Sequence, residues 1–203
     1  MSQFCQGVRC VFLSPRTLVA VIVLGLAASA SARGPQVVVL LPQLTSPPGE
    51  IAVPRTAELS VRDERNTKVI GSRGGVFIAN FIINSEDDIS PGLTELLTQE
   101  LERQGYTVIA PGTGGEVKLS VALQKLTYDM GGTVGAWVKL SSLVEVTSTK
   151  GGDTLTSRYQ TNHKEEFAFA PDEEKNSELI NTVLGKTLDQ FLADTELRDF
   201  LSK

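Results

Sequence analysis

Alternation of apolar and polar residues dominates this chain beyond residue 56 and predicts a domain rich in β-strands. Ala57, Leu59 and Val61 occupy every second position, which is typical of a half-buried strand. The same period of two recurs over much longer stretches in the second half of the chain. The pattern predicts strands at Val37–Leu41, Ala57–Val61, Lys68–Ile70, Tyr106–Ala110, Val117–Tyr128, Val134–Val146 and Leu155–Phe169.

Interruptions of this alternation predict turns and one bulge. The apolar phase slips at Gln124 and Lys125 and resumes at Leu126, which indicates a β-bulge. Gly131–Gly132 and Lys150–Asp153 are typical turns between strands. Asp63–Thr67 also supplies turn residues, so Lys68–Ile70 is interpreted as the returning strand of a hairpin, with a bend or bulge at Gly71 and Gly74–Gly75. Val76–Ile83 is apolar and is expected to be a strand or an arm along the sheet.

Helical spacing appears in two places. Ser90 suits an N-cap, Pro91 suits the first helical position, and Gly105 suits the stop. Between them one apolar stripe is formed by Leu93, Leu96, Leu97 and Leu101. A second helix after Asp172–Glu174 has a longer stripe of Leu179, Ile180, Val183, Leu184, Leu188, Phe191 and Leu192. A last short helix is expected to be capped by Asp194 or Thr195.

The order of strands, helix, four strands and helix predicts an α+β fold, with an antiparallel β-sheet and two main helices packed on one face. We expect a single domain over 57–203, preceded by an extended segment at 33–56 that contains the breaker Ser46–Gly49. Trp137 and Leu143 fall on the sheet face opposite the main apolar stripe. Because Trp is usually well buried, we expect a second layer to cover them; an exposed apolar patch is the alternative.

The first 32 residues have the pattern of a secretory signal peptide. Arg9 and Arg16 give a positive start, Leu18–Ala28 is apolar, and Ala30-Ser31-Ala32 offers a cleavage site. The apolar run is shorter than the roughly 20 residues that a spanning helix needs. We therefore expect export and no stable transmembrane span after processing, with a retained membrane anchor as the alternative.

Composition narrows the classes of function. Both cysteines, Cys5 and Cys10, precede the apolar run, so the processed chain would offer no disulfide, no thiolate and no acceptor for a lipid. Loss of the two arginines of the signal changes the net charge from −5 to −7. An acidic domain is poorly suited to phosphate backbones, which argues against nucleic acid as a partner.

The sequence contains no recognisable arrangement of residues for hydrolysis or for binding a metal. His163 is the only histidine, and a polar edge strand explains it better than a catalytic base because no nucleophile motif accompanies it. Glu165 and Glu166 are adjacent on a strand and point to opposite faces, so they cannot act on one bond. Glu86–Asp88 favours the dipole of the helix that follows rather than a metal. We predict no enzyme activity, no cofactor and no metal.

The densest cluster of charge and glycine is Val61–Gly75. Gly71–Gly75 resembles a backbone nest for an anion with Arg73 as its clamp, although it lacks the end of a P-loop. A glycine bulge and a solvated turn with weak ion pairs are the alternatives. The candidate binding residues are Arg62, Asp63, Arg65, Arg73 and Trp137.

Several of these segments resemble one family. The signal, the V-R-D-E-R…V-I-G-S-R-G-G segment, ISPGLTELLTQELERQGY at Ile89–Tyr106, LQKLTY at Leu123–Tyr128 and DTELRDFL at Asp194–Leu201 are together similar to the YajG family of envelope lipoproteins. The resemblance implies a small protein of the Gram-negative periplasm or outer membrane, without known catalytic residues. This chain departs from the pattern because its signal ends without a lipobox cysteine, which favours a soluble periplasmic form over outer-membrane association.

We therefore expect a non-catalytic periplasmic or cell-envelope protein that binds another envelope protein or a cell-wall component, such as a peptidoglycan-associated partner. The alternative is a carrier that holds a small or lipidic ligand between the sheet and the helices.

Overall fold

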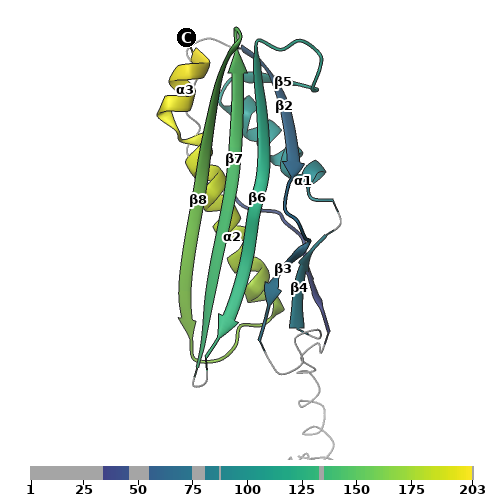
Figure 1. Cartoon of the computed structure of the whole chain (residues 1–203), viewed down its shortest axis with the longest axis vertical. Coiled ribbons are helices and arrows are strands. Elements are labelled where there is room, and N and C mark those ends of the chain that lie inside the picture. Colours follow the sequence, from purple (N-terminus) through teal and green to yellow (C-terminus); the bar gives the residue numbers. More distant parts are fainter. Residues whose placement is uncertain (1–33, 46–54, 75–80, 87, 133–134, 203) are drawn as a thin grey trace, which may run out of the picture. The chain divides into compact units, whose positions relative to one another are not determined.

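The structure is a computed structural model that describes residues 34–45, 55–74, 81–86, 88–132 and 135–202. They lie in one compact unit, Arg33–Lys203 (Figure 1). The predicted signal, the Ser46–Gly49 breaker and most of the apolar stretch Val76–Ile83 lie outside the described residues. The elements are β1 (Gln36–Val38), β2 (Arg55–Asp63), β3 (Val69–Ser72), β4 (Ile82–Ser85), α1 (Ser90–Arg103), β5 (Tyr106–Ile109), β6 (Val117–Gly131), β7 (Ala136–Lys150), β8 (Asp153–Phe167), α2 (Glu173–Leu192) and α3 (Thr195–Ser202).

The α+β class is confirmed, but the prediction of an antiparallel sheet is wrong. The eight strands form one mixed sheet, in which β6, β7 and β8 are antiparallel neighbours. The pairs β1–β4, β2–β5, β2–β6 and β3–β6 are parallel. Strand β2 has β5 on one side and β6 on the other, and α1 precedes both of these strands in the chain. The chain passes through α1 between β2 or β3 and their partners, and this crossover makes the β2–β5, β2–β6 and β3–β6 pairs parallel. Alternation within single strands does not reveal such a connection.

The predicted hairpin of Ala57–Val61 with Lys68–Ile70 does not form. Instead β2 and β3 follow one another along the same edge of β6 and in the same direction (Figure 1). Ala57–Asp63 lies beside Val117–Leu123, and Gly71–Ser72 lies beside Tyr128–Asp129. A bulge between Val69 and Gly71 confirms the predicted irregularity. A β-carbon on Gly71 would lie 1.7 Å from the Tyr128 carbonyl oxygen, so only glycine fits there.

Three long strands form the centre of the sheet, with 15 residues in each of β6, β7 and β8. The predicted bulge is confirmed, since the β6–β7 register shifts between Leu123 and Lys125. Gly151 (φ 59°) and Gly152 (φ 97°) make the predicted turn from β7 to β8. These two features keep the apolar positions of all three strands on one face.

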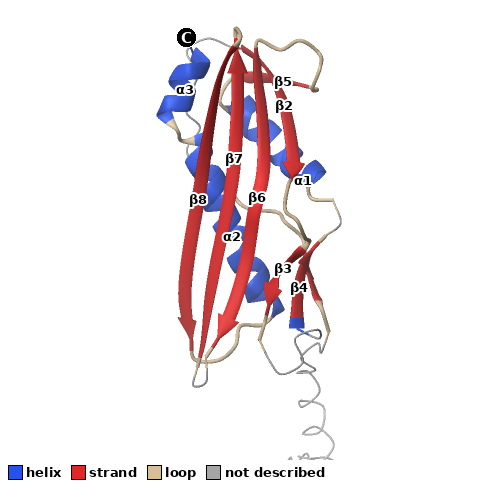
Figure 2. Ribbon diagram, in the orientation of Figure 1, coloured by secondary structure: helices blue, strands red, loops and turns tan. Residues whose placement is uncertain are grey.

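All three helices lie against that face (Figure 2). Leu101 of α1, Leu119 of β6, Phe191 of α2 and Leu197 of α3 line one small hollow and belong to the same hydrophobic core. The predicted apolar stripe of the second helix is buried throughout. Burial of each such side chain contributes about 1.5–3 kcal/mol, so this face supplies the main stabilising term.

The predictions of the helix ends are partly confirmed: Asp194 caps α3 and Gly105 follows α1, whereas Ser90 and Pro91 each lie one position farther into α1 than predicted, and α2 already begins at Glu173. Asp172 caps α2 by accepting a hydrogen bond from the Lys175 amide at 2.8 Å, and Asp194 caps α3 through the amides of Glu196 and Leu197. Gly105 follows α1 with φ 100°, as expected of a C-terminal stop. Ser90, however, is the first residue of α1 and not its N-cap; the cap position is Ile89, without a side-chain cap.

The N-terminal segment Gly34–Thr45 is part of the packed unit. Its first residues form β1 beside β4, and Val38 and Leu40 are buried in the core. A β-carbon on Gly185 of α2 would lie 2.6 Å from the Gln43 carbonyl oxygen, so the segment contacts α2 where that helix has no side chain. The predicted buried strand Val37–Leu41 is therefore only partly right. Strand β1 ends at Val38, and every second side chain of the apolar run faces solvent.

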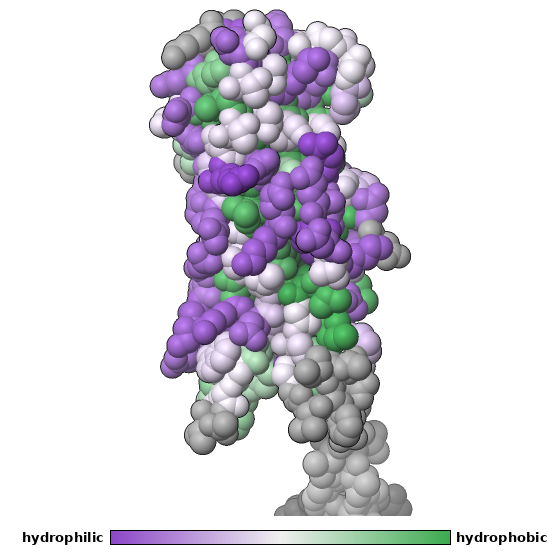
Figure 3. Space-filling model, viewed as in Figure 1, coloured by the Kyte–Doolittle hydropathy of each residue, from purple (hydrophilic) through white to green (hydrophobic). Residues whose placement is uncertain are grey.

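The opposite face of the sheet is largely hydrophilic, as Figure 3 shows over β6, β7 and β8. The prediction that a second layer covers Trp137 and Leu143 is wrong for the described part of the chain, because the three helices pack on the other face. Trp137 is half-buried by its own sheet. Its ring lies against Gly131, and the Lys139 ammonium is 4.6 Å from the ring centroid.

Gly185 and Gly92 provide a matched test of the contact between the N-terminal segment and α2. We expect Gly185→Ala to lower the free energy of unfolding by about 1–3 kcal/mol, because the added methyl displaces the Gln43 backbone. Gly92→Ala in α1 meets only the end of the Leu41 side chain at 3.9 Å and should leave stability unchanged or raise it by up to about 1 kcal/mol. Urea unfolding followed by circular dichroism measures both. Equal effects of the two substitutions would contradict this view of the contact.

Candidate docking surface

An apolar ridge on the N-terminal segment is the clearest candidate site. Val37, Val39 and Leu41 are 62%, 50% and 63% exposed, and we call these three side chains the apolar ridge. Among the described residues, the other large apolar side chains that are exposed are Val69 and Phe169. Three of the five thus lie within five consecutive residues. Clustered apolar exposure of this kind marks interaction sites more often than isolated exposure does.

Two hollows flank Leu41, one toward each long helix. The hollow toward α1 has a volume of about 330 Å³ and is mainly apolar, lined by Leu40, Leu41, Pro42, Gln43, Leu44, Gly92 and Leu96. The hollow toward α2 has a volume of about 480 Å³ and a polar wall that includes Glu178, Lys186 and Asp189. The ridge and its hollows thus form an apolar strip with a charged rim on the α2 side.

Polar contacts along the segment hold the ridge in place. The Arg73 guanidinium donates to the Gly34 carbonyl at 2.6 Å and to Glu173 at 3.0 Å. Farther along, the Asn181 amide donates to the Val39 carbonyl at 3.1 Å. At the end of the segment, the Thr45 hydroxyl donates to Asp189 at 2.6 Å. Three of these partners belong to α2, so this helix orients the ridge.

Among the predicted binding residues, Asp63 and Arg65 form an internal pair. The Arg65 guanidinium donates two hydrogen bonds to Asp63, at 2.8 and 2.7 Å, and one to the Ser85 hydroxyl at 2.8 Å. Its side chain is only 4% exposed. Burial tends to raise the pKa of Asp63, but hydrogen bonds from Arg65 outweigh it and hold that pKa below its usual value. This pair therefore fixes the connection from β2 to β3.

The remaining predicted binding residues lie apart from one another. Arg62 is exposed and donates to the Ser120 hydroxyl at 3.0 Å, and it lines a surface hollow of about 550 Å³ with its neighbours up to Lys68. Arg73 is engaged with the N-terminal segment, and Trp137 lies on the outer face of β7. Asp63 lies beside Leu123 of β6, and Ser72, which precedes Arg73, lies beside Asp129 of β6. At about 3.3 Å a residue, Leu123 and Asp129 are about 20 Å apart. The five residues thus do not form one site, and binding by them stays a prediction.

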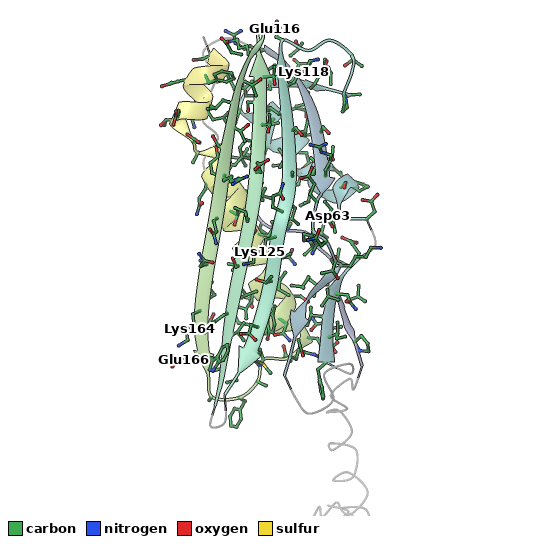
Figure 4. All side chains as sticks on the ribbon, in the orientation of Figure 1. Asp63, Glu116, Lys118, Lys125, Lys164 and Glu166 are labelled. Atoms are coloured by element: carbon green, nitrogen blue, oxygen red, sulfur yellow. The ribbon has the colours of Figure 1, made fainter. Side chains whose placement is uncertain are left out.

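The chain does build a backbone nest, but around one of its own carboxylates and at a different glycine loop. Glu58 accepts hydrogen bonds from the amides of Gly112, Gly114 and Gly115 at 3.0, 2.5 and 2.8 Å. These bonds, led by that from Gly112, lower the pKa of Glu58, and Lys118 adds to the effect from 4.0 Å. Figure 4 shows Lys118 and Glu116 at this end of the sheet. Alternation alone places Glu58 on the solvent side, so sequence reasoning missed its burial.

A hollow lined by residues of the sheet and of all three helices has a volume of only about 20 Å³. This volume is enough for about one water molecule, whereas pockets for small ligands measure about 300–1,000 Å³. His163 lies on the edge strand β8 with Nε2 3.2 Å from Glu165, as expected of a surface residue. Among the described residues, no group of acidic, histidine or cysteine side chains has the arrangement of a metal site. No helix in this part of the chain is long and apolar enough to cross a membrane.

Comparison with known proteins identifies the family. A sequence model for the family described as "Uncharacterized lipoprotein" matches residues 42–202. The chain belongs to this lipoprotein family. Two curated relatives, both described as "Uncharacterized lipoprotein YajG" and from Escherichia coli strains K12 and O6:H1, are 25% identical over 113 residues. That match covers 55% of this chain and 57% of each relative, so the chain spans little more than half their length.

Solved structures with a similar fold include a bacterial protein. Protein XCC0632 from Xanthomonas campestris aligns with a TM-score of 0.55 at 9% identity, over 81% of this chain and 97% of that protein. This similarity shows the fold alone. The family resemblance predicted from the sequence is confirmed, and membership of a lipoprotein family implies a location in the cell envelope.

The Glu58 nest generates a pH prediction. Because the folded-state pKa of Glu58 is lowered, its contribution to stability is complete above the unfolded pKa near 4.5 and is lost as pH falls through the folded value. Glu58→Gln should therefore lower stability at neutral pH and flatten its decline below about pH 5. Urea midpoints measured from neutral to acidic pH test this, with exposed Glu102→Gln on α1 as the control. Parallel pH curves for Glu58→Gln and the unsubstituted protein would contradict the expectation.

Proposed function

We propose that this chain is a non-catalytic protein of the periplasm or the outer-membrane surface that binds another envelope protein through the apolar ridge. The observation that carries this proposal is the exposure of Val37, Val39 and Leu41 beside two surface hollows. Lipoprotein family membership supports the envelope location. The matched region begins at Pro42, directly after the ridge, so the proposal for the ridge rests on its exposure and its surroundings.

The energetics of the ridge favour a protein partner. A partner that covered these side chains would gain about 25 cal/mol for each Å² of apolar surface removed from water. The hollow toward α1 can receive an apolar side chain, because Leu40, Leu44 and Leu96 form its wall. Anchors of this kind, set in an apolar pocket with a polar rim, dominate the energy of many protein interfaces.

Two alternatives fit the ridge less well. A cell-wall glycan is polar and would pair poorly with three aliphatic side chains, since recognition of polar groups needs matched hydrogen bonds. A small or lipidic ligand held between the sheet and the helices would need a pocket there, and the hollow of about 20 Å³ lined by both is far smaller than a typical ligand pocket. The charged rim of Glu178, Lys186 and Asp189 instead suits the mixed polar margin of a protein interface.

The test compares exposed apolar residues inside and outside the ridge. A photo-crosslinking amino acid placed at Val39 should capture one partner in intact cells, and the same probe at Val69, which is also exposed, should not. The captured protein is identified, purified and titrated against the protein by calorimetry. Val39→Ser/Leu41→Ser should weaken that binding by about tenfold or more, corresponding to the loss of about 1.4 kcal/mol of apolar contact.

The matched control is Phe169→Ser, which removes a side chain that is 86% exposed and lies outside the ridge. It should leave the affinity unchanged, and thermal unfolding of each variant verifies the fold. Equal affinity of the ridge variant and the control would overturn the proposal, as would equal capture from Val39 and Val69.

A further inference from the structure

Strand β8 is a long open edge of the sheet. It runs from Asp153 to Phe167 and pairs only with β7 among the described strands. The β7–β8 register is continuous over all 15 pairs, without a shift. The strand contains no proline and no glycine. It therefore lacks the bulge, the proline and the short length by which proteins commonly prevent an edge strand from pairing with another chain.

The turn before β8 determines which backbone groups face the open side. In a hairpin with a two-residue turn, the residues that flank the turn, here Lys150 and Asp153, form a hydrogen-bonded pair. Along the strands, non-hydrogen-bonded and hydrogen-bonded pairs then alternate. The residues that do not exchange hydrogen bonds with β7 point their amide and carbonyl groups to the free edge. They are Thr154, Thr156, Arg158, Gln160, Asn162, Lys164 and Glu166, and all seven have exposed side chains.

We propose that β8 pairs with β8 of a second copy of this chain, antiparallel and centred on Asn162. In this register Asn162 lies opposite its own counterpart and Lys164 lies opposite Gln160. Arg158 lies opposite Glu166 of the second copy, and the two-fold symmetry produces this opposite-charge pair twice. Figure 4 shows Lys164 and Glu166 on the open side of β8.

Charge selects this register over its neighbours. A shift of the centre to Thr161 would place Arg158 opposite Lys164 of the second copy, again twice, and like charges directly opposite one another destabilise a sheet. A centre at Gln160 would leave Arg158 opposite Asn162 and remove the ion pair. The Asn162 register alone among these three gives complementary charge.

A second copy fits this edge for a further reason. In a symmetric dimer the same edge is buried on both molecules, so no free β8 edge remains and the pairing does not propagate into a fibre. The helices pack on the inner face, and the edge groups belong to residues whose side chains lie on the outer face. The apolar ridge belongs to another element and is not needed for this contact, so self-association is independent of the proposed function.

A charge exchange tests the register. The protein is purified from the envelope fraction of cells that express the full chain, and its mass is measured by size exclusion with light scattering over a range of concentrations. Arg158→Glu and Glu166→Arg should each raise the dimer dissociation constant by about tenfold or more, because each places like charges opposite one another. The double variant Arg158→Glu/Glu166→Arg should restore the dimer.

The control is Lys125→Glu, which makes the same change of charge on β6, away from the edge, and should leave the dimer unchanged (Figure 4). Arg158 also pairs with Glu145 at 2.7 Å in its own chain, and the double variant loses that pair too. Recovery of the dimer in the double variant therefore separates the interface from internal stability. A monomer at every concentration of the unsubstituted protein would overturn the proposal, and so would a dimer that persists in both single variants.

Cysteine crosslinking gives an independent readout of the same register. In a background with Cys5→Ser and Cys10→Ser, Asn162→Cys should form an intermolecular disulfide on mild oxidation, since directly opposite residues lie within bridging distance. Thr156→Cys is on the same edge but away from the centre, and it should not crosslink. Equal crosslinking at the two positions would exclude the Asn162 register.

Discussion

The packing of the N-terminal segment against α2 is the constraint on which the candidate surface depends. The segment approaches the helix at Gly185, where a side chain would collide with the Gln43 backbone. This approach allows Val38 and Leu40 to enter the core, and the alternation of an extended chain then turns Val37, Val39 and Leu41 outward. Hydrogen bonds from Arg73 and Asn181 fix the segment in that phase. A shift of one residue would bury the ridge and expose the core residues.

Several charged groups of this protein form hydrogen bonds and ion pairs within the chain. Arg65 and Asp63 fix the link between β2 and β3, and Arg73 joins β3, the N-terminal segment and α2. Glu58 fills the nest of the Gly112–Gly115 loop. Charge and glycine that suggest ligand binding in the sequence thus support the fold, because buried charges require partners. Among the described residues, the two surfaces that we propose for association are an apolar strip and an open strand edge.

These two surfaces have different physical characters. The ridge offers aliphatic side chains beside hollows, which favours a partner with apolar anchors of its own. The β8 edge offers backbone groups and mixed charge, which favours another strand in one register. Because the two surfaces belong to different elements, the two proposed contacts do not compete with each other.

The sequence by itself determined the local structure. The periods of two and 3.6 identified the long strands, the β6 bulge, the Lys150–Asp153 turn and the buried stripe of α2, because these features depend on neighbouring residues. The family followed from the order of short motifs. Only the tertiary structure decided the parallel pairing of β2 and β3 with β6, the burial of Glu58 and the exposure of the Val37–Leu41 run. Each depends on contacts between residues distant in the chain, and an uninterrupted apolar run has no alternation to indicate which side chains will face water.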